Sequence, residues 1–255
     1  MKLTLGYFYP KELNLYGDNG NVEILCSRAR SRNIDVEVLE INSDTKLTPD
    51  LEKNINLIFM GGGPDSGQKA MYENLINVKG SFLKEYIGAG GVGLYVCGSY
   101  QLLGRYYKSA DGSVLEGLGA FDLCTEHFGK EKPRCIGNVV CEICPGLKND
   151  TIFSSVNRLG TTLVGFENHG GRTYLGKGML PLAKILTGNG NNGEDKTEGV
   201  LYKNSIGTYL HGPVLSKNSH LADYLLAKGL GLSGLEQLDD SLIFSAHAAA
   251  KKLRQ

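Results

Sequence analysis

The first half of the chain alternates short apolar segments with longer segments of mixed polarity. The apolar or alternating segments are residues 3–9, 35–41, 56–60 and 92–96. Their length predicts β-strands, and the unbroken run at 56–60 is typical of a parallel sheet buried on both faces. Asp18 or Asn19 is expected to cap a helix that ends near Arg32. A second helical region is expected after Asp65 and ends near Ile87. This order predicts an α/β fold with a doubly wound, mainly parallel sheet.

The second half has a different pattern, in which short strands are separated by polar, glycine-rich turns. Strands are expected at residues 119–124, 136–143, 162–167, 182–186, 199–202 and 205–210. Two helices are expected at the end of the chain, over residues 216–230 and 241–255. Ser216 or Asn218 is expected to cap the first, and the second is amphipathic and basic.

The composition narrows the class of protein. The 255 residues contain no internal repeat and no Gly/Ser/Pro linker, so we expect one domain over residues 1–230 and a helical C-terminal extension over 231–255. Lysine plus arginine balance aspartate plus glutamate at 27 each, which gives no reason to expect a nucleic-acid partner. No apolar run approaches the roughly 20 residues of a membrane span. The N-terminus lacks the apolar core of a signal peptide, and six cysteines without an export signal are typical of reduced thiols, so we expect a cytoplasmic protein.

The segment 92–104 carries the strongest chemical signal. A strand is expected to end at Val96 and a helix to begin near Tyr100, so Cys97 lies on the turn between them. Gly98 offers the space and the backbone freedom that such a turn needs. A helix N-terminus lowers the pKa of a thiol, and its N–H groups can bind an oxyanion. The residue types are therefore consistent with a nucleophile, and also with a buried structural cysteine.

A cysteine nucleophile requires a base, and the sequence has five histidines. His211 follows an apolar strand and precedes a Gly-Pro turn, so we favour it as the base. His169, within Glu167-Asn-His-Gly-Gly171, also lies at a strand end and is the main competitor, unless it only hydrogen-bonds its own turn. The other histidines are expected in a loop, a surface helix and the tail, without a role: His127, His220 and His247.

Two further motifs each allow two interpretations. Gly61-Gly-Gly-Pro-Asp65 can bind an anion through backbone N–H groups or can simply be a tight turn; it lacks the Lys-Ser/Thr of a P-loop. Its expected place beside Cys97 favours an oxyanion role. Cys141-Glu-Ile-Cys144 has the spacing of a zinc-ligand pair, but no second pair follows and Cys141 lies inside an alternating strand. We therefore expect no metal site.

Several motifs resemble known proteins. Those similar to class I glutamine amidotransferases of the cobyric-acid-synthase-like branch are Gly61-Gly-Gly-Pro-Asp65, Val96-Cys-Gly-Ser-Tyr-Gln-Leu-Leu-Gly104 and Tyr209-Leu-His-Gly-Pro213. Those that more narrowly resemble GatD-type subunits of lipid II isoglutaminyl synthase lie at residues 13–18, 163–174 and 188–195. The resemblance covers about residues 3 to 230 and implies a flavodoxin-like fold.

The resemblance also implies a glutaminase activity. Cys97 would attack the γ-amide of glutamine, His211 would shuttle protons, and a γ-glutamyl thioester would form and be hydrolysed. Backbone N–H groups near Gly63 and Gly98 would form the oxyanion hole, and Arg134 would hold the α-carboxylate of glutamine. Ammonia would pass to a Mur-ligase-like partner in a heterodimer. That partner would use ATP and Mg²⁺ to amidate the D-glutamate α-carboxyl of lipid II in peptidoglycan synthesis, while this chain would hold no cofactor.

One position departs from the pattern. Many class I amidotransferases have a glutamate two residues after the histidine, where this chain has Pro213. The site is then a Cys–His dyad, or a carboxylate comes from elsewhere, such as Glu167 or the partner. Two other functions also stay open: a stand-alone cysteine γ-glutamyl hydrolase on the same fold, and a binding module with an inert cysteine.

Overall fold

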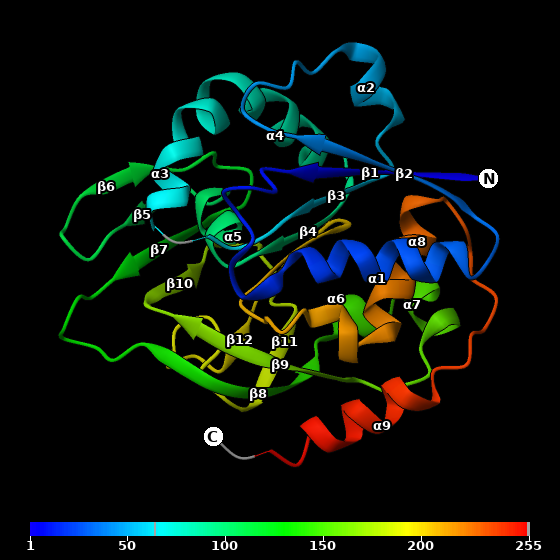
Figure 1. The fold of residues 1–255 in the computed structure, drawn as a ribbon. Helices are drawn as coiled ribbons and strands as arrows, with labels where there is room; N and C mark the ends of the chain where they lie inside the picture. Colours follow the sequence, from blue (N-terminus) through cyan, green and yellow to red (C-terminus); the bar gives the residue numbers. More distant parts are fainter. Residues whose placement is uncertain (64, 254–255) are drawn as a thin grey trace.

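A six-stranded sheet forms the centre of the molecule (Figure 1). The computed structural model describes residues 1–63 and 65–253. The strands in spatial order are β13 (Val200–Tyr202), β14 (Ser205–Thr208), β4 (Val92–Val96), β3 (Leu57–Met60), β1 (Lys2–Phe8) and β2 (Asp35–Ile41). All neighbouring pairs are parallel except β13–β14. The prediction of a doubly wound, mainly parallel sheet is therefore confirmed.

Helices cover both faces of this sheet. Figure 1 shows α3 and α4 on one face and α1 and α8 on the other. The helices around this sheet are α1 (Asn19–Arg30), α2 (Pro49–Asn54), α3 (Asp65–Asn74), α4 (Gly80–Gly88) and α8 (Ser219–Gly229). The predicted helical region before Ile87 is interrupted, because a π-helical turn, Leu75–Lys79, joins α3 to α4 and buries Leu75 and Lys79.

Two smaller sheets extend the second half of the chain. The first comprises β10 (Gly171–Leu175), β7 (Leu123–His127), β5 (Tyr106–Lys108) and β6 (Val114–Glu116), and the second comprises β12 (Thr197–Glu198), β11 (Ala183–Thr187), β8 (Cys135–Ile143) and β9 (Thr162–His169). The strands predicted at 136–143 and 162–167 are confirmed as β8 and β9. The strand predicted at 119–124 begins only at Leu123, because Phe121 buries its ring from the turn before it. The short strands β5, β6, β10 and β12 were missed.

The helix α8 corrects two predictions. It was expected on the surface, yet it packs against β3, β4 and α7 (Thr151–Val156) and buries His220. Burial lowers the pKa of His220 to about 3, and its Nε2 donates a hydrogen bond to the carbonyl oxygen of Thr162. Asn218 lies at the N-cap position, but its side chain does not cap the helix. It instead accepts from the N–H of Val164 and donates to the Val164 oxygen, which ties α8 to β9.

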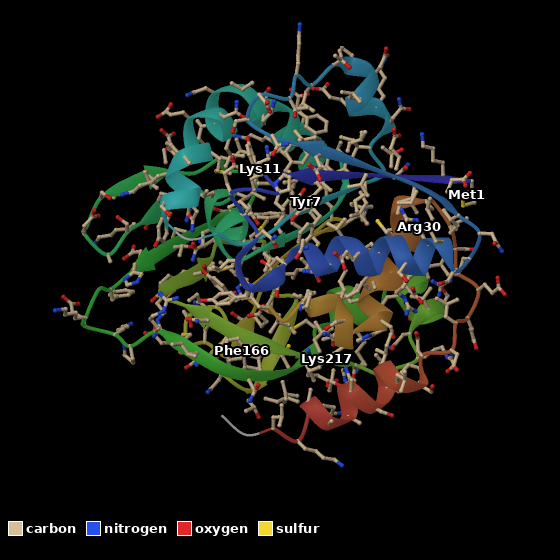
Figure 2. The ribbon with its side chains drawn as sticks, viewed as in Figure 1. Met1, Tyr7, Lys11, Arg30, Phe166 and Lys217 are labelled. Atoms are coloured by element: carbon tan, nitrogen blue, oxygen red, sulfur yellow. The ribbon has the colours of Figure 1, made fainter. Side chains whose placement is uncertain are left out.

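The C-terminal helix α9 (Ser241–Ala250) packs against β9 and the 3₁₀ turn Val214–Lys217. His247 is buried there, with Nδ1 donating to the Lys217 oxygen and Nε2 accepting from the Thr162 hydroxyl. Figure 2 shows Phe166 and Lys217 above this helix. Among the residues that the structure describes, no helix is long and apolar enough to cross a membrane.

A buried ion network fastens the segment before α9 to the rest of the fold. Arg28 in α1 binds Asp223 in α8 through Nε at 2.7 Å and binds Asp240 through Nη1 at 2.6 Å. Arg32 adds a second contact to Asp223 at 2.7 Å and donates a hydrogen bond to the main-chain oxygen of Glu236. Two guanidinium groups thus share the carboxylate of Asp223, which accepts four hydrogen bonds.

We expect Asp223→Asn to destabilise the protein by about 3–5 kcal/mol, because it leaves two buried guanidinium groups underpaired. The measurement is urea unfolding at neutral pH. Glu37→Gln is the matched control, since the Lys2–Glu37 pair is exposed and such pairs contribute less than about 1 kcal/mol. Equal losses in the two variants would contradict a structural role for the network.

Candidate active site

Cys97 lies on a strained turn between β4 and α5 (Gly98–Leu102). The predicted strand–turn–helix is confirmed, although the helix begins at Gly98 rather than near Tyr100. The positive φ was expected at Gly98 but falls on Cys97 itself, at φ 52° and ψ −105°. A non-glycine residue in this region is typical of a nucleophile elbow. The Ser99 hydroxyl donates to the Met60 oxygen and so fixes the turn against β3.

The structure brings Asp18 to His211. The Oδ1 atom of Asp18 lies 3.1 Å from Nδ1 of His211, and its Oδ2 accepts from the N–H of Gly62 at 2.7 Å. Asp18 was predicted as a possible helix cap, but its fully buried carboxylate makes no cap hydrogen bond to α1. Pro213 packs against Gly20 in the first turn of α1, where an added Cβ would lie 2.3 Å from the proline ring. A carboxylate at the start of α1 thus contacts the imidazole, whereas position 213 holds a proline.

Gly62 is the point at which Asp18, Cys97 and His211 meet. A Cβ on Gly62 would lie 2.9 Å from Cβ of Cys97, 3.1 Å from Cε1 of His211 and 3.3 Å from Oδ2 of Asp18. Any side chain here would separate the three groups. The central glycine of the Gly-rich motif is thus required by close approach rather than by backbone conformation.

The environment keeps His211 protonated. Burial alone would lower its pKa, but the hydrogen bond to Asp18 and the interaction with Cys97 outweigh burial and raise the pKa to about 10. The edge of the Tyr16 ring packs on the imidazole, with centroids 4.9 Å apart. Tyr16 itself has φ 57° in the 3₁₀ turn Leu15–Gly17. Nε2 of His211 is buried and has no hydrogen-bond partner among the described residues.

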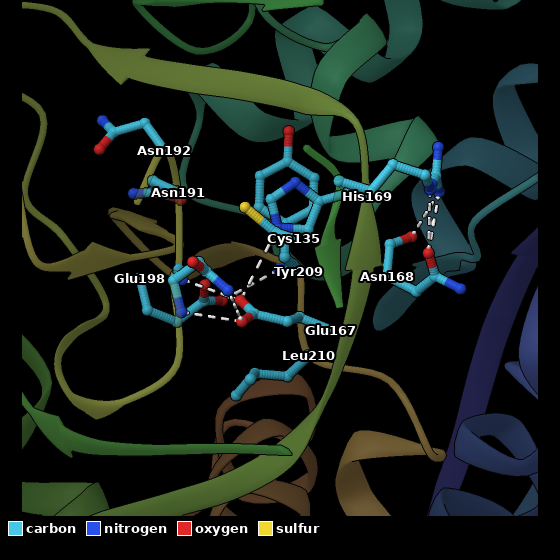
Figure 3. A network of polar contacts seen from close by, with 12 residues as sticks. Cys135, Glu167, Asn168, His169, Asn191, Asn192, Glu198, Tyr209 and Leu210 are labelled. Carbon is cyan, nitrogen blue, oxygen red and sulfur yellow. Dashed lines mark hydrogen bonds and ion pairs between the residues drawn. The ribbon is translucent and has the colours of Figure 1, made fainter. Parts of the chain in front are cut away.

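His169, the competitor, occupies a different environment (Figure 3). Its Nδ1 donates to the Gly171 oxygen at 2.7 Å, and its ring stacks on Tyr209 with centroids 3.7 Å apart. Burial lowers the pKa of His169, whereas the pKa of His211 is raised. Glu167 lies 3.8 Å from it but accepts from the N–H groups of Asn189 and Gly190. Glu167 therefore anchors the 188–195 loop, whereas Asp18 pairs with His211.

A cavity of about 540 Å³ opens beside Cys97. The predicted site residues Gly63, His169 and Arg134 line this cavity together with Cys97. Gly98 is the next residue after Cys97 in the chain. Arg134 is held by Asn168, to which its Nε and Nη2 donate. His127, which was expected in a loop and without a role, lies at the end of β7 and also lines the cavity.

The cysteine pair of the C-x-x-C motif lies away from the cavity. Cys141 is fully buried in β8, and Cys144 precedes the short helix α6 (Pro145–Lys148). Within residues 1–63 and 65–253, no group of three or more His, Cys, Asp or Glu side chains is arranged to hold a metal ion.

Comparison with solved structures first gives the fold. A glutamine amidotransferase from Thermotoga maritima superposes with a TM-score of 0.55 at 14% identity, covering 97% of this chain and 95% of that one. This similarity shows the fold, which is that of class I glutamine amidotransferases.

Sequence comparison then gives the family. The profile of the CobB/CobQ-like glutamine amidotransferase domain matches residues 4–219, and the chain belongs to this family. It is 44% identical to the GatD subunit of the glutamine-hydrolysing lipid II isoglutaminyl synthase of Staphylococcus aureus, over 92% of this chain and 87% of that protein. The corresponding subunit of Streptococcus pneumoniae is 36% identical over 90% and 81%. The resemblance inferred from the motifs is confirmed.

We expect Asp18→Asn to lower the pKa of His211 from about 10, because the charge of Asp18 that opposes burial is removed while only the interaction with Cys97 remains. An NMR titration of the imidazole measures this pKa, and Glu167→Gln is the control that should leave it unchanged. Since the folded pKa is raised, the stability contributed by His211 is complete below about pH 6.5 and lost as pH rises through about 10. An unchanged pKa in Asp18→Asn would contradict the assigned contact.

Proposed function

We propose that the chain is the glutaminase subunit of a lipid II isoglutaminyl synthase. The observation that carries the proposal is the convergence of Cys97, His211 and Asp18 around Gly62, at the edge of a cavity that Arg134 also lines. The similarity to two GatD subunits over most of their length supports the choice of substrate and complex.

Formation of the thioester follows from the charges in the site. A His211 with a raised pKa is an imidazolium at neutral pH and favours a thiolate on Cys97. The thiolate attacks the γ-carbon of glutamine, and the oxygen that becomes negative binds backbone N–H groups at Gly63 and Gly98. Nε2 of His211 then donates its proton to the amide nitrogen. The C–N bond breaks, ammonia leaves, and Cys97 holds a γ-glutamyl thioester.

Hydrolysis of the thioester uses the same groups, with His211 now accepting a proton instead of donating one. His211, now neutral, takes a proton from a water molecule that attacks the thioester carbon. The C–S bond breaks, glutamate is released, and the Cys97 thiolate and the imidazolium form again. Asp18 accepts the hydrogen bond from Nδ1 throughout and stabilises the charged ring. It takes the place of the glutamate that Pro213 replaces.

Arg134 is placed to bind the α-carboxylate of glutamine at the cavity wall. Asn168 holds the guanidinium through its side-chain and main-chain oxygens, and this fixes the plane of the guanidinium before the substrate arrives. A planar, fixed fork matches a carboxylate better than a flexible ammonium does.

The ammonia requires an acceptor that is activated elsewhere. This sequence has no P-loop Lys-Ser/Thr, so we assign ATP and Mg²⁺ to a Mur-ligase-like partner in a heterodimer. That partner would amidate the D-glutamate α-carboxyl of lipid II. Docking over the Cys97 cavity would keep ammonia from protonation in water, and the loops at 168–172 and 188–195 are the candidate contacts.

The test is ammonia release from glutamine by the purified chain, with and without the candidate partner. We expect weak hydrolysis alone, loss of all hydrolysis in Cys97→Ala, and amidation of a lipid-linked muropeptide only when partner and ATP are present. His169→Ala should cost less activity than His211→Ala, whose loss typically costs several orders of magnitude. Amidation by the isolated chain, or cleavage of γ-glutamyl peptides in preference to glutamine, would overturn the proposal.

We expect Arg134→Lys to raise the KM for glutamine about tenfold with little change in kcat, because the charge stays while the bidentate fork is lost. Steady-state kinetics with glutamine measure both constants. Arg105→Lys is the control, because Arg105 forms an exposed ion pair with Asp122 outside the cavity. If KM were unchanged in Arg134→Lys, the carboxylate would be bound by another group.

A further inference from the structure

One buried side chain in the cavity has no assigned role. Gln68 lies in α3, is only 4% exposed, and lines the same cavity as Cys97. Its carboxamide binds Gly63 and lies beside Gly98, the two glycines of the expected oxyanion hole. Nε2 donates to the Gly63 oxygen at 3.1 Å, and a Cβ on Gly98 would lie 2.7 Å from the same Nε2.

The hydrogen bond to Gly63 fixes which way the carboxamide of Gln68 points. A carbonyl oxygen accepts only, so the atom facing Gly63 must be the nitrogen, which donates. The oxygen Oε1 is then an acceptor, and it is buried without a partner among the described residues. A buried acceptor without a donor costs free energy, commonly about 1–3 kcal/mol, unless a ligand supplies one.

The γ-carboxamide of glutamine supplies such a donor. With its carbonyl oxygen on the backbone N–H groups at Gly63 and Gly98, its NH₂ group lies on the other side of the same carbon. That nitrogen carries two hydrogens, and neither is consumed when the nitrogen accepts the proton of His211. Glutamate, the product, presents a carboxylate oxygen at this point, which has no hydrogen to donate.

We propose that Gln68 recognises the substrate carboxamide: its Oε1 accepts a hydrogen bond from the γ-NH₂ of glutamine and from the ammonia that leaves. Gln68 thereby selects an amide over a carboxylate at the reacting carbon and orients the nitrogen toward His211. This inference rests on the proposed glutaminase function and adds a specificity-determining residue to it.

The test compares two substrates in Gln68→Met, which keeps the length of the side chain and removes both its acceptor and its donor to Gly63; only loss of the acceptor distinguishes the two substrates. We expect kcat/KM for glutamine to fall about tenfold, because the buried N–H of the substrate is left without an acceptor. The γ-methyl ester of glutamate has no N–H at the leaving group, so its kcat/KM should change less than about threefold. Gln237→Met makes the same chemical change at an exposed position of the C-terminal segment and should affect neither substrate.

A binding measurement keeps the inference testable if turnover is too slow to measure. In the Cys97→Ala background, Gln68→Met should weaken the binding of glutamine about tenfold and leave that of glutamate unchanged or tighter. An equal loss for the amide and the ester, or for glutamine and glutamate, would show a structural role and overturn the inference. Hydrolysis of glutamine by the wild-type chain tests the proposed function separately. If the wild-type chain did not hydrolyse glutamine, the proposed function would be wrong independently of the role of Gln68.

Discussion

The absence of a side chain at Gly62 is the constraint on which the site depends. Three segments far apart in the sequence contribute Asp18, Cys97 and His211, and all three come within 3.3 Å of the position that a Cβ on Gly62 would occupy. The same residue donates its N–H to Asp18. One glycine therefore provides both the space for the three groups and the hydrogen bond that orients the carboxylate.

The parallel sheet explains why these segments can meet. β3, β4 and β14 are neighbours, and each leads at its carboxyl end into one part of the site. Gly62 follows β3, Cys97 follows β4, and His211 follows β14. Asp18 comes from the segment between β1 and α1, and the first turn of α1 packs on Pro213, where Gly20 leaves room for the proline ring. The missing glutamate at position 213 and the carboxylate at the start of α1 are parts of one arrangement.

Much of the central sheet and the turn at Cys97 was predictable from the sequence. The central strands are apolar runs, and the turn at Cys97 follows from the strand before it. Asp18 was not found as a partner of His211 because its local pattern, a polar residue before a helix, is that of a cap. The contact joins residues 193 positions apart, and no local pattern reports such a distance. The buried position of α8 was missed for a similar reason, since its polar residues are satisfied by β9 and α1 rather than by water.

The helix that follows Asp18 is held by the C-terminal part of the chain. Arg28 lies in the last turn of α1 and is held by Asp223 of α8 and by Asp240, which immediately precedes α9. Fixing the carboxyl end of a rigid helix also limits the movement of its first residues. A carboxylate that must stay about 3 Å from an imidazole tolerates little movement, since charge-assisted hydrogen bonds weaken steeply with distance and angle. The segment beyond the matched domain therefore stabilises the helix on which the charge of His211 depends.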